Sequence, residues 1–236
     1  MTAARPTASP RLLLFDVDGT LLSSGPGARD AFVSALLDVF GARPAVETYA
    51  FDGKLDPVIV AELMREAGVP EDDVRRGLAR ALSLYLDRLA AALAAEKPRV
   101  KPGVEPLLDA VGKVPGAVPA LLTGNVERGA RIKLSAAGLW HHFRFGVFGD
   151  EAARREELGA LALARVRAAT GRAFVGAECV VVGDSRQDVA CGKAIGARVV
   201  AVATGKTSPA ELRAAGADVV LSDFSDLAAA SEAILG

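Results

Sequence analysis

One stretch of sequence decides the fold: Leu12-Leu13-Leu14-Phe15-Asp16-Val17-Asp18-Gly19-Thr20. Four consecutive apolar residues are typical of a strand that is buried on both faces, as in a parallel sheet. The run ends abruptly in two carboxylates, and the glycine that follows them allows a sharp turn. The stretch therefore predicts a buried strand that delivers Asp16 and Asp18 to one edge of a sheet.

Similar apolar runs recur along the chain and alternate with segments of helical spacing. This alternation predicts an α/β fold whose core is a doubly wound, mainly parallel, Rossmann-like sheet. In such a sheet the ligand site lies beyond the carboxyl ends of the strands. The other expected strands are 118–122, 145–148, 180–182, 199–202 and 219–221, and the expected core helices are 126–137, 156–169 and 185–196.

The segment between Ser24 and Val100 interrupts this alternation, because it contains no run that suits a buried strand. Its apolar residues follow helical spacing instead, which predicts an inserted all-helical cap. Glycine or proline occurs at both joints of the insert. We expect cap helices at 31–40, 58–67 and 73–95, a cap domain at 24–101, a catalytic core at 11–23 and 102–236, and a flexible tail at 1–10.

Composition excludes several classes of protein. The 28 basic and 29 acidic residues give a net charge of −1, which argues against a nucleic-acid or membrane-surface partner. No apolar run approaches the roughly 18 residues of a membrane span, and Met1–Pro10 lacks a signal-peptide stretch. We therefore expect a cytoplasmic monomer or homodimer.

Two further motifs follow expected strands. Thr123-Gly124-Asn125 offers a hydroxyl and backbone N–H groups at a helix start, which can bind an anion; a simple helix cap is the alternative. Gly183-Asp184-Ser185-Arg186-Gln187-Asp188 supplies a second pair of acids. Its alternative is a helix N-cap at Asp184 with a solvated Asp188.

The topology would bring Asp16, Asp18 and Asp184 together at one edge of the sheet. Carboxylates so close repel one another unless a divalent cation holds them, and oxygen-only ligands favour Mg²⁺. A cation beside an anion-binding turn indicates phosphoryl chemistry. Such chemistry also calls for a basic side chain, for which Arg155, Arg154 and Lys133 are the candidates.

The three motifs together resemble the haloacid dehalogenase superfamily, specifically its phosphatase branch. The resemblance runs from Leu12 to about Gly205, and the insert is similar to that superfamily's small helical cap. The stretch Phe51-Asp52-Gly53-Lys54-Leu55-Asp56 resembles the substrate-specificity loop of phosphoglycolate phosphatase-like members.

The resemblance implies roles for the acids. Asp16 would be the nucleophile that forms an aspartyl-phosphate. Asp18 would protonate the leaving oxygen and later activate water, with a pKa raised by the neighbouring anions. The Asp16 carboxylate, the Asp18 backbone carbonyl and Asp184 would hold Mg²⁺, and Asp188 and Ser185 would support them.

The resemblance also implies substrate contacts. Thr123 and Gly124 would bond the phosphoryl oxygens, and Asn125 would bind substrate beside them. Lys54 would reach down from the cap, with a salt bridge to Asp56 as the alternative.

One departure concerns the family's third motif, a lysine followed by proline-rich sequence. Glu151-Ala152-Ala153-Arg154-Arg155-Glu156 stands in its place. Arginine balances phosphate charge as well as lysine and often binds bidentately. Arg155 is the preferred residue and Arg154 the next.

The sequence thus predicts a Mg²⁺-dependent phosphatase acting on a small phosphorylated metabolite, with a 2-phosphoglycolate-like substrate among the candidates. A sugar phosphomutase, similar to beta-phosphoglucomutase, is the main alternative because it shares Asp16 and Asp18. A haloacid dehalogenase is disfavoured because it needs neither Asp18 nor a metal. A non-catalytic phospho-receiver module is disfavoured by the cap, since a lid that excludes water serves turnover.

Overall fold

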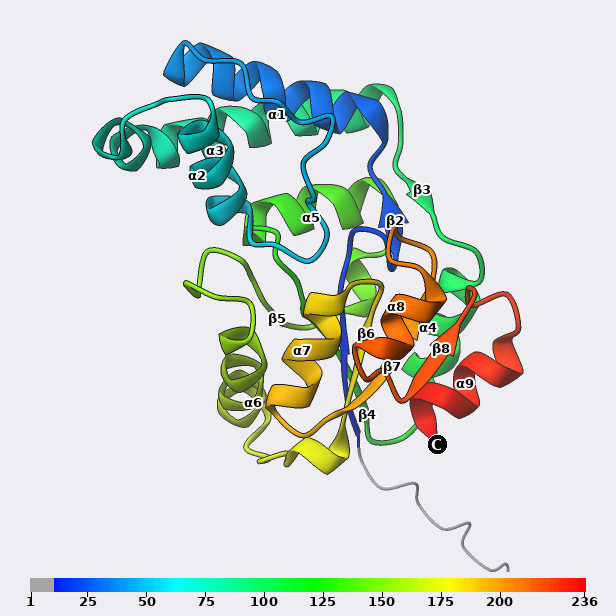
Figure 1. Cartoon of the computed structure of the whole chain (residues 1–236). Coiled ribbons are helices and arrows are strands. Elements are labelled where there is room, and N and C mark those ends of the chain that lie inside the picture. The colour runs from blue at the N-terminus through cyan, green and yellow to red at the C-terminus, as the bar shows by residue number, and fades with distance from the viewer. Residues whose placement is uncertain (1–10) are drawn as a thin grey trace, which may run out of the picture.

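The apolar run that begins at Leu12 forms β1 (Arg11–Phe15), an inner strand of the sheet in this computed structural model, which describes residues 11–236 (Figure 1). The tail expected at residues 1–10 lies outside the described residues. β1 pairs in parallel with β4 (Ala117–Leu122) on one side and with β6 (Cys179–Gly183) on the other. Its burial on both faces agrees with the unbroken apolar run.

The sheet is doubly wound, as predicted. Its six strands are all parallel and run in the order β5-β4-β1-β6-β7-β8. The chain builds outward from β1 to β4 and β5, then returns to the other side of β1 for β6. The reversal places the topological switch point at β1, where α/β sheets bind their ligands. The remaining strands are β5 (Gly146–Val147), β7 (Arg198–Val202) and β8 (Val219–Leu221).

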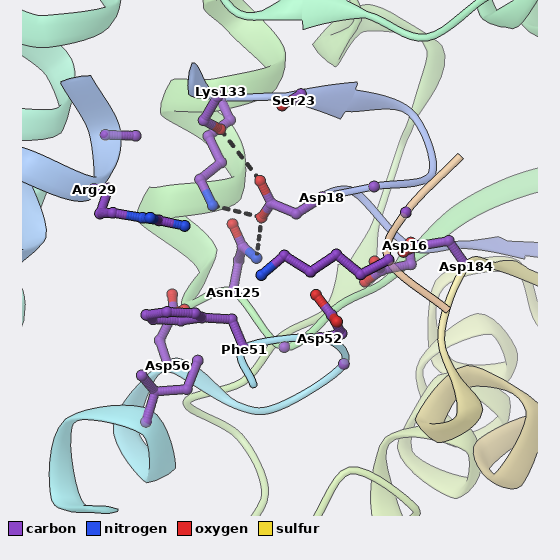
Figure 2. A pocket seen from close by; sticks show the side chains of 18 of the residues that line it. Asp16, Asp18, Ser23, Arg29, Phe51, Asp52, Asp56, Asn125, Lys133 and Asp184 are labelled. Carbon is purple, nitrogen blue, oxygen red and sulfur yellow. Dashed lines mark hydrogen bonds and ion pairs between the residues drawn. The ribbon is translucent and has the colours of Figure 1, made fainter. Parts of the chain in front are cut away.

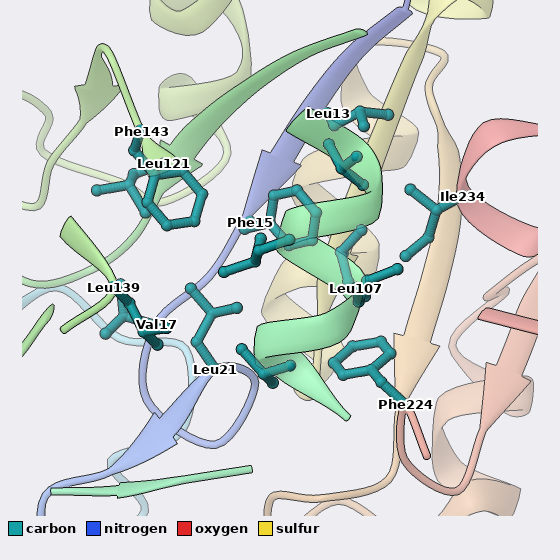
Figure 3. Close-up of a cluster of buried hydrophobic side chains, with 14 of the residues drawn as sticks. Leu13, Phe15, Val17, Leu21, Leu107, Leu121, Leu139, Phe143, Phe224 and Ile234 are labelled. Atoms are coloured by element: carbon teal, nitrogen blue, oxygen red, sulfur yellow. The ribbon is translucent and has the colours of Figure 1, made fainter. Parts of the chain in front are cut away.

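Side chains of β1 alternate between two apolar layers. Leu13 and Phe15 face the layer that contains α4 (Val104–Gly112) and α9 (Leu227–Leu235), as Figure 3 shows. Leu12 and Leu14 face the layer of α6 (Glu157–Thr170) and α7 (Arg186–Ala194). The core also contains α5 (Glu127–Ala136), α8 (Pro209–Ala214) and the short 3-10 helices η1 (Trp140–His142) and η2 (Gly176–Glu178).

Three helices form the predicted cap beyond the carboxyl edge of the sheet (Figure 1): α1 (Gly25–Phe40), α2 (Asp56–Glu66) and α3 (Glu71–Ala95). They share an apolar core that includes Phe32, Leu63 and Leu89. Two short strands, β2 (Leu22–Ser23) and β3 (Arg99–Val100), pair in antiparallel fashion where the chain enters and leaves the cap. The domain boundaries at 23/24 and 101/102 stay a prediction.

The structure adds elements that the sequence analysis did not predict. α4 is absent from the expectations, although Val104, Leu107, Leu108 and Val111 follow helical spacing and are buried. α1 begins at Gly25 rather than at residue 31, with Pro26 in its first turn.

No helix within residues 11–236 is both long enough and apolar enough to span a bilayer.

The cap core should contribute strongly to stability. Leu89 is fully buried on α3, whereas Leu37 on α1 is 38% exposed. Leu89→Ala should lower the free energy of unfolding by about 2–5 kcal/mol, because it removes buried methyl groups and leaves a cavity. Leu37→Ala, the matched control, should cost about 1 kcal/mol or less. Urea denaturation measures both; equal losses would contradict this packing.

Candidate active site

A cavity of about 390 Å³ lies between the cap and the carboxyl edge of the sheet (Figure 2). The core and the cap both line it, so a molecule held there touches both units. The lining core residues include Asp16, Asp18, Gly124, Asn125, Lys133, Arg155 and Asp184, and the lining cap residues include Arg29, Phe32, Phe51, Asp52, Asp56 and Tyr85.

Three buried acids cluster on the core side of this site, and two of them, Asp16 and Asp184, line the cavity. Asp16 follows β1, and Asp184 and Asp188 follow the neighbouring β6; each offers a carboxylate oxygen within 4.8 Å of the others. Burial and the Asp188 charge raise the pKa of Asp16 to about 7. Burial, with the charges of Asp188 and Asp16, raises the pKa of Asp184 to about 8. The raised pKa values mean that the positive charge near the cluster does not balance its three carboxylates.

The Asp184 carboxylate is fixed from several sides. The Thr20 hydroxyl donates to its Oδ1 at 2.8 Å. Gly19 and Gly205 lie so close to it that a Cβ at either position would clash with the carboxylate. Gly19 also has a φ of +86°, which other residues rarely adopt. An oxygen-only, buried and preorganised cluster of this kind could hold a metal ion.

Arg155 is the cation that faces the acid cluster. Its Nη2 donates to Asp16 Oδ1 at 2.9 Å and also pairs with Asp188 Oδ1. The neighbouring Arg154 is exposed and pairs with Glu157 at 3.0 Å. Of the two arginines that the sequence offered, the structure thus brings only Arg155 to the acids.

Asp188 and Ser185 hold each other and the start of α7. Asp188 Oδ2 accepts from the Ser185 amide at 3.0 Å and from its hydroxyl at 2.6 Å. The Ser185 hydroxyl accepts in return from the Asp188 amide at 3.2 Å. The alternative reading, an N-cap at Asp184 with a solvated Asp188, is wrong, because Ser185 is the cap and Asp188 is 1% exposed.

Asp18 is bound by groups that stabilise its charged form (Figure 2). Its Oδ2 accepts from Lys133 Nζ at 2.5 Å and from Asn125 Nδ2 at 2.8 Å, and its Oδ1 accepts from Ser24 at 3.2 Å. Burial alone would raise the pKa of Asp18, but the Lys133 ammonium and these hydrogen bonds outweigh it and lower the pKa. The expectation of a raised pKa is therefore wrong.

The loop that begins at Phe51 docks onto the core. The Asp56 amide donates to Gly124 O at 2.8 Å, and the Asp56 carboxylate accepts from the Val126 amide at 2.9 Å, where α5 begins. Gly53 lies directly against the Ser185 side chain. These contacts place Phe51 and the neighbouring Asp52 in the cavity wall.

Two other predicted residues lie differently from expectation. The Lys54 ammonium donates to Glu62 at 2.5 Å and to the Tyr49 hydroxyl at 3.1 Å, so it neither lines the cavity nor pairs with Asp56. Thr123 is fully buried, and its hydroxyl accepts from the Asn125 amide at 3.3 Å. Its neighbours Gly124 and Asn125 line the cavity instead.

Sequence reasoning missed several residues of the site. Arg29, Lys101 and Lys206 line the cavity, and Gly205 lies against Asp184. None of them belongs to a motif that marks chemistry. Lys133 was a candidate for the phosphate partner, but no spacing rule could show that it would pair with Asp18.

The chain is similar to proteins of one family over most of its length. Residues 13–193 match the haloacid dehalogenase-like hydrolases. The probable phosphatase IndB of Dickeya dadantii (strain 3937) is 29% identical over 95% of this chain and 94% of that protein. Phosphoglycolate phosphatase 1 of Pseudomonas aeruginosa is 30% identical over 96% of this chain and 83% of that protein.

Solved structures show the same fold. A predicted phosphatase from Clostridium acetobutylicum has a TM-score of 0.72 at 21% identity, covering 93% of this chain and 96% of that one. A Thermotoga maritima protein described as a beta-phosphoglucomutase has a TM-score of 0.61 at 22% identity, covering 94% and 98%. The fold is thus common to proteins described as phosphatases and as mutases.

The acid cluster predicts how the stability of the metal-free protein depends on pH. The folded pKa values of Asp16 and Asp184, about 7 and about 8, lie above their ordinary value of 3.8. Between these values the folded state binds more protons than the unfolded state, so the free energy of unfolding falls as pH rises. The Tm of chelator-treated protein should be lower at about pH 8 than at about pH 5.

Asp184→Asn removes one titrating group and should therefore weaken the fall of Tm with rising pH. Asp30→Asn, a control at an exposed residue of α1, should leave that fall unchanged. Added Mg²⁺ should raise the Tm of the original protein more at the higher pH, because protons compete with the cation. A Tm of the chelated protein that rises over this range would contradict the buried cluster.

Proposed function

The chain belongs to the haloacid dehalogenase-like hydrolase family, and we propose that it hydrolyses a small phosphomonoester with Asp16 as nucleophile and Mg²⁺ as cofactor. Its relatives named as phosphatases make it a phosphoric monoester hydrolase. The observation that carries the proposal is the buried cluster of Asp16, Asp184 and Asp188, bound by Arg155 on the core side of a cavity.

Asp16 performs the first step. One of its carboxylate oxygens attacks phosphorus, an aspartyl-phosphate forms, and the bond from phosphorus to the leaving oxygen breaks. Water then attacks the aspartyl-phosphate, inorganic phosphate leaves, and the Asp16 carboxylate is restored. Arg155 orients Asp16 through the 2.9 Å hydrogen bond from Nη2.

Asp18 handles the proton in both steps. It gives a proton to the leaving oxygen and later takes one from the attacking water. Lys133 and Asn125 fix the carboxylate at one oxygen and lower its pKa. The negative charge of a bound phosphate raises the pKa of a nearby carboxyl group, so Asp18 gains its proton with the substrate in place.

The Asp16 and Asp184 carboxylates and the Asp18 backbone carbonyl would hold the Mg²⁺ ion. Their oxygen-only donor set and the raised pKa values of both carboxyls fit a hard divalent cation. When bound, Mg²⁺ neutralises charge on the cluster and on the phosphoryl oxygens. Asp188 and Ser185 keep Asp184 in place through the start of α7.

A buried donor without a protein partner supports a phosphoryl site. Arg155 Nε has no hydrogen-bond acceptor within residues 11–236, and Arg155 lines the cavity. Arg155 Nε is a donor, so it suits a phosphoryl oxygen beside Asp16. The Gly124 backbone lines the same cavity, and Thr123 holds this turn through the Asn125 amide. We assign the binding of the transferring phosphoryl group to this turn and Arg155.

The cap restricts the substrate to a small molecule. The cavity of about 390 Å³ is lined on the cap side by aromatic residues, among them Phe32 and Phe51. Closure of a cap excludes water that would compete in the first step. A relative named phosphoglycolate phosphatase supports a compact substrate such as 2-phosphoglycolate.

A sugar phosphomutase remains the second candidate, because a protein described as one shares the fold. The aspartyl-phosphate is common to both reactions. Release of inorganic phosphate over many turnovers separates them, since a mutase returns the phosphoryl group to a sugar.

Asp16→Asn should reduce phosphate release from p-nitrophenyl phosphate to the level of a blank, because an amide cannot form the aspartyl-phosphate. The exposed control Asp30→Asn should retain activity. Chelation should stop turnover by the original protein and Mg²⁺ should restore it. Turnover retained by Asp16→Asn, with an unchanged circular dichroism spectrum, would refute the assignment of the nucleophile.

Adjacent arginines allow a second matched test. Arg155→Ala should lower kcat/KM by about 10²- to 10³-fold, because it removes a buried charged donor from the reacting group. Arg154→Ala should change kcat/KM by less than about twofold, because its exposed ion pair contributes little. Equal effects of the two substitutions would remove Arg155 from the mechanism.

A further inference from the structure

We propose that Arg29 is a specificity-determining residue that binds a carboxylate on the leaving group of the substrate. The inference rests on the proposed function and adds a chemical requirement to it. The substrate would carry two anionic groups, the phosphate on the core side of the cavity and the carboxylate on its cap side.

Arg29 belongs to the cap but lines the same cavity as the acid cluster. It lies in the second turn of α1, which starts at Gly25 directly after β2. Figure 2 shows its side chain reaching from α1 towards Asp18, Asn125 and Lys133. Its guanidinium therefore faces the place where the leaving group must lie.

Other cations in the cavity are engaged by the protein. Lys133 pairs with Asp18, Arg155 pairs with Asp16 and Asp188, and Lys101 donates to Thr204 O at 2.6 Å. For Arg29 and Lys206 the structure gives no ion pair or hydrogen bond within residues 11–236. These two side chains are thus the cavity cations whose charge is available to a ligand.

The order of groups in the site favours Arg29 over Lys206. Lys206 follows Gly205, whose backbone lies against Asp184, so the backbone of this lysine belongs to the core side of the cavity, whereas Arg29 belongs to the cap. The leaving oxygen must lie beside Asp18, which protonates it. The rest of the leaving group then extends to the cap side, where Arg29 stands near the aromatic wall formed by Phe32 and Phe51.

The chemistry of the guanidinium selects a carboxylate. Its planar pair of donors matches the two oxygens of a carboxylate in a bidentate arrangement. The cap wall of the cavity combines apolar side chains, among them Ile59 and Tyr85, with the carboxylates of Asp52 and Asp56, so Arg29 is the cation of a mixed wall.

The test compares two esters that differ in one group: 2-phosphoglycolate and 2-hydroxyethyl phosphate, which has a neutral hydroxymethyl group in place of the carboxylate. The original protein should prefer 2-phosphoglycolate in kcat/KM. Arg29→Gln should lower that preference by about 10- to 100-fold, the range expected for a lost charged hydrogen bond, mostly through the KM for 2-phosphoglycolate. Arg29→Lys should restore part of the preference, because lysine supplies the positive charge but lacks the planar pair of N–H donors.

Controls separate this role from a structural one. Arg43→Gln makes the same change at an exposed cap arginine outside the cavity and should leave the ratio of the two kcat/KM values unchanged. A ratio that falls in Lys206→Gln but not in Arg29→Gln overturns the assignment, as does an original protein without preference. If neither ester is hydrolysed with Mg²⁺ present, the proposed function itself fails. Hydrolysis with an unaffected ratio refutes Arg29 alone.

Discussion

The site depends on one electrostatic constraint, the burial of three carboxylates against a single guanidinium. Asp16, Asp184 and Asp188 are each less than 10% exposed, and Arg155 is the basic side chain that contacts two of them. Burial, together with the charges of the neighbouring acids that one guanidinium cannot offset, raises the pKa values of Asp16 and Asp184. The proposed Mg²⁺ would complete the cluster, so a need for metal would follow from the packing of the chain.

The sheet makes this crowding possible. β1 pairs directly with β4 and β6, so the loops that begin at Asp16, Thr123 and Asp184 meet at one edge of the sheet although they are far apart in the sequence. The apolar run before Asp16 and the one before Asp184 predicted both strands and their burial. The sequence could also indicate that acids meet an anion-binding turn, because the carboxyl ends of parallel strands converge.

The spacing of residues in the sequence could not predict which partner a side chain points to. Lys133 was a candidate for the phosphate contact and Lys54 for a substrate contact from the cap, yet Lys54 pairs with Glu62 and Lys133 with Asp18. In both cases the lysine pairs with a partly buried acid that tertiary packing brings next to it. The sequence did not predict the β2–β3 pair either, because strands of two residues are too short to show a periodic pattern.

The two buried cations Arg155 and Lys133 each hold one of the two acids that we propose to be catalytic. Arg155 donates a hydrogen bond to Asp16, the proposed nucleophile, and Lys133, from α5, donates one to Asp18, the proposed acid. Because Lys133 lowers the pKa of Asp18 and burial raises that of Asp16, two carboxyls only two residues apart differ in proton affinity. In the metal-free protein this order is the reverse of the one that the proposed roles need, because a nucleophile must be ionised and a general acid protonated. A cation beside Asp16 would lower its pKa and a phosphate beside Asp18 would raise that of Asp18, so the proposed cofactor and substrate would together reverse the order. α5 contributes to the site at two points: the Val126 amide at its start binds Asp56, and Lys133, two turns later, binds Asp18.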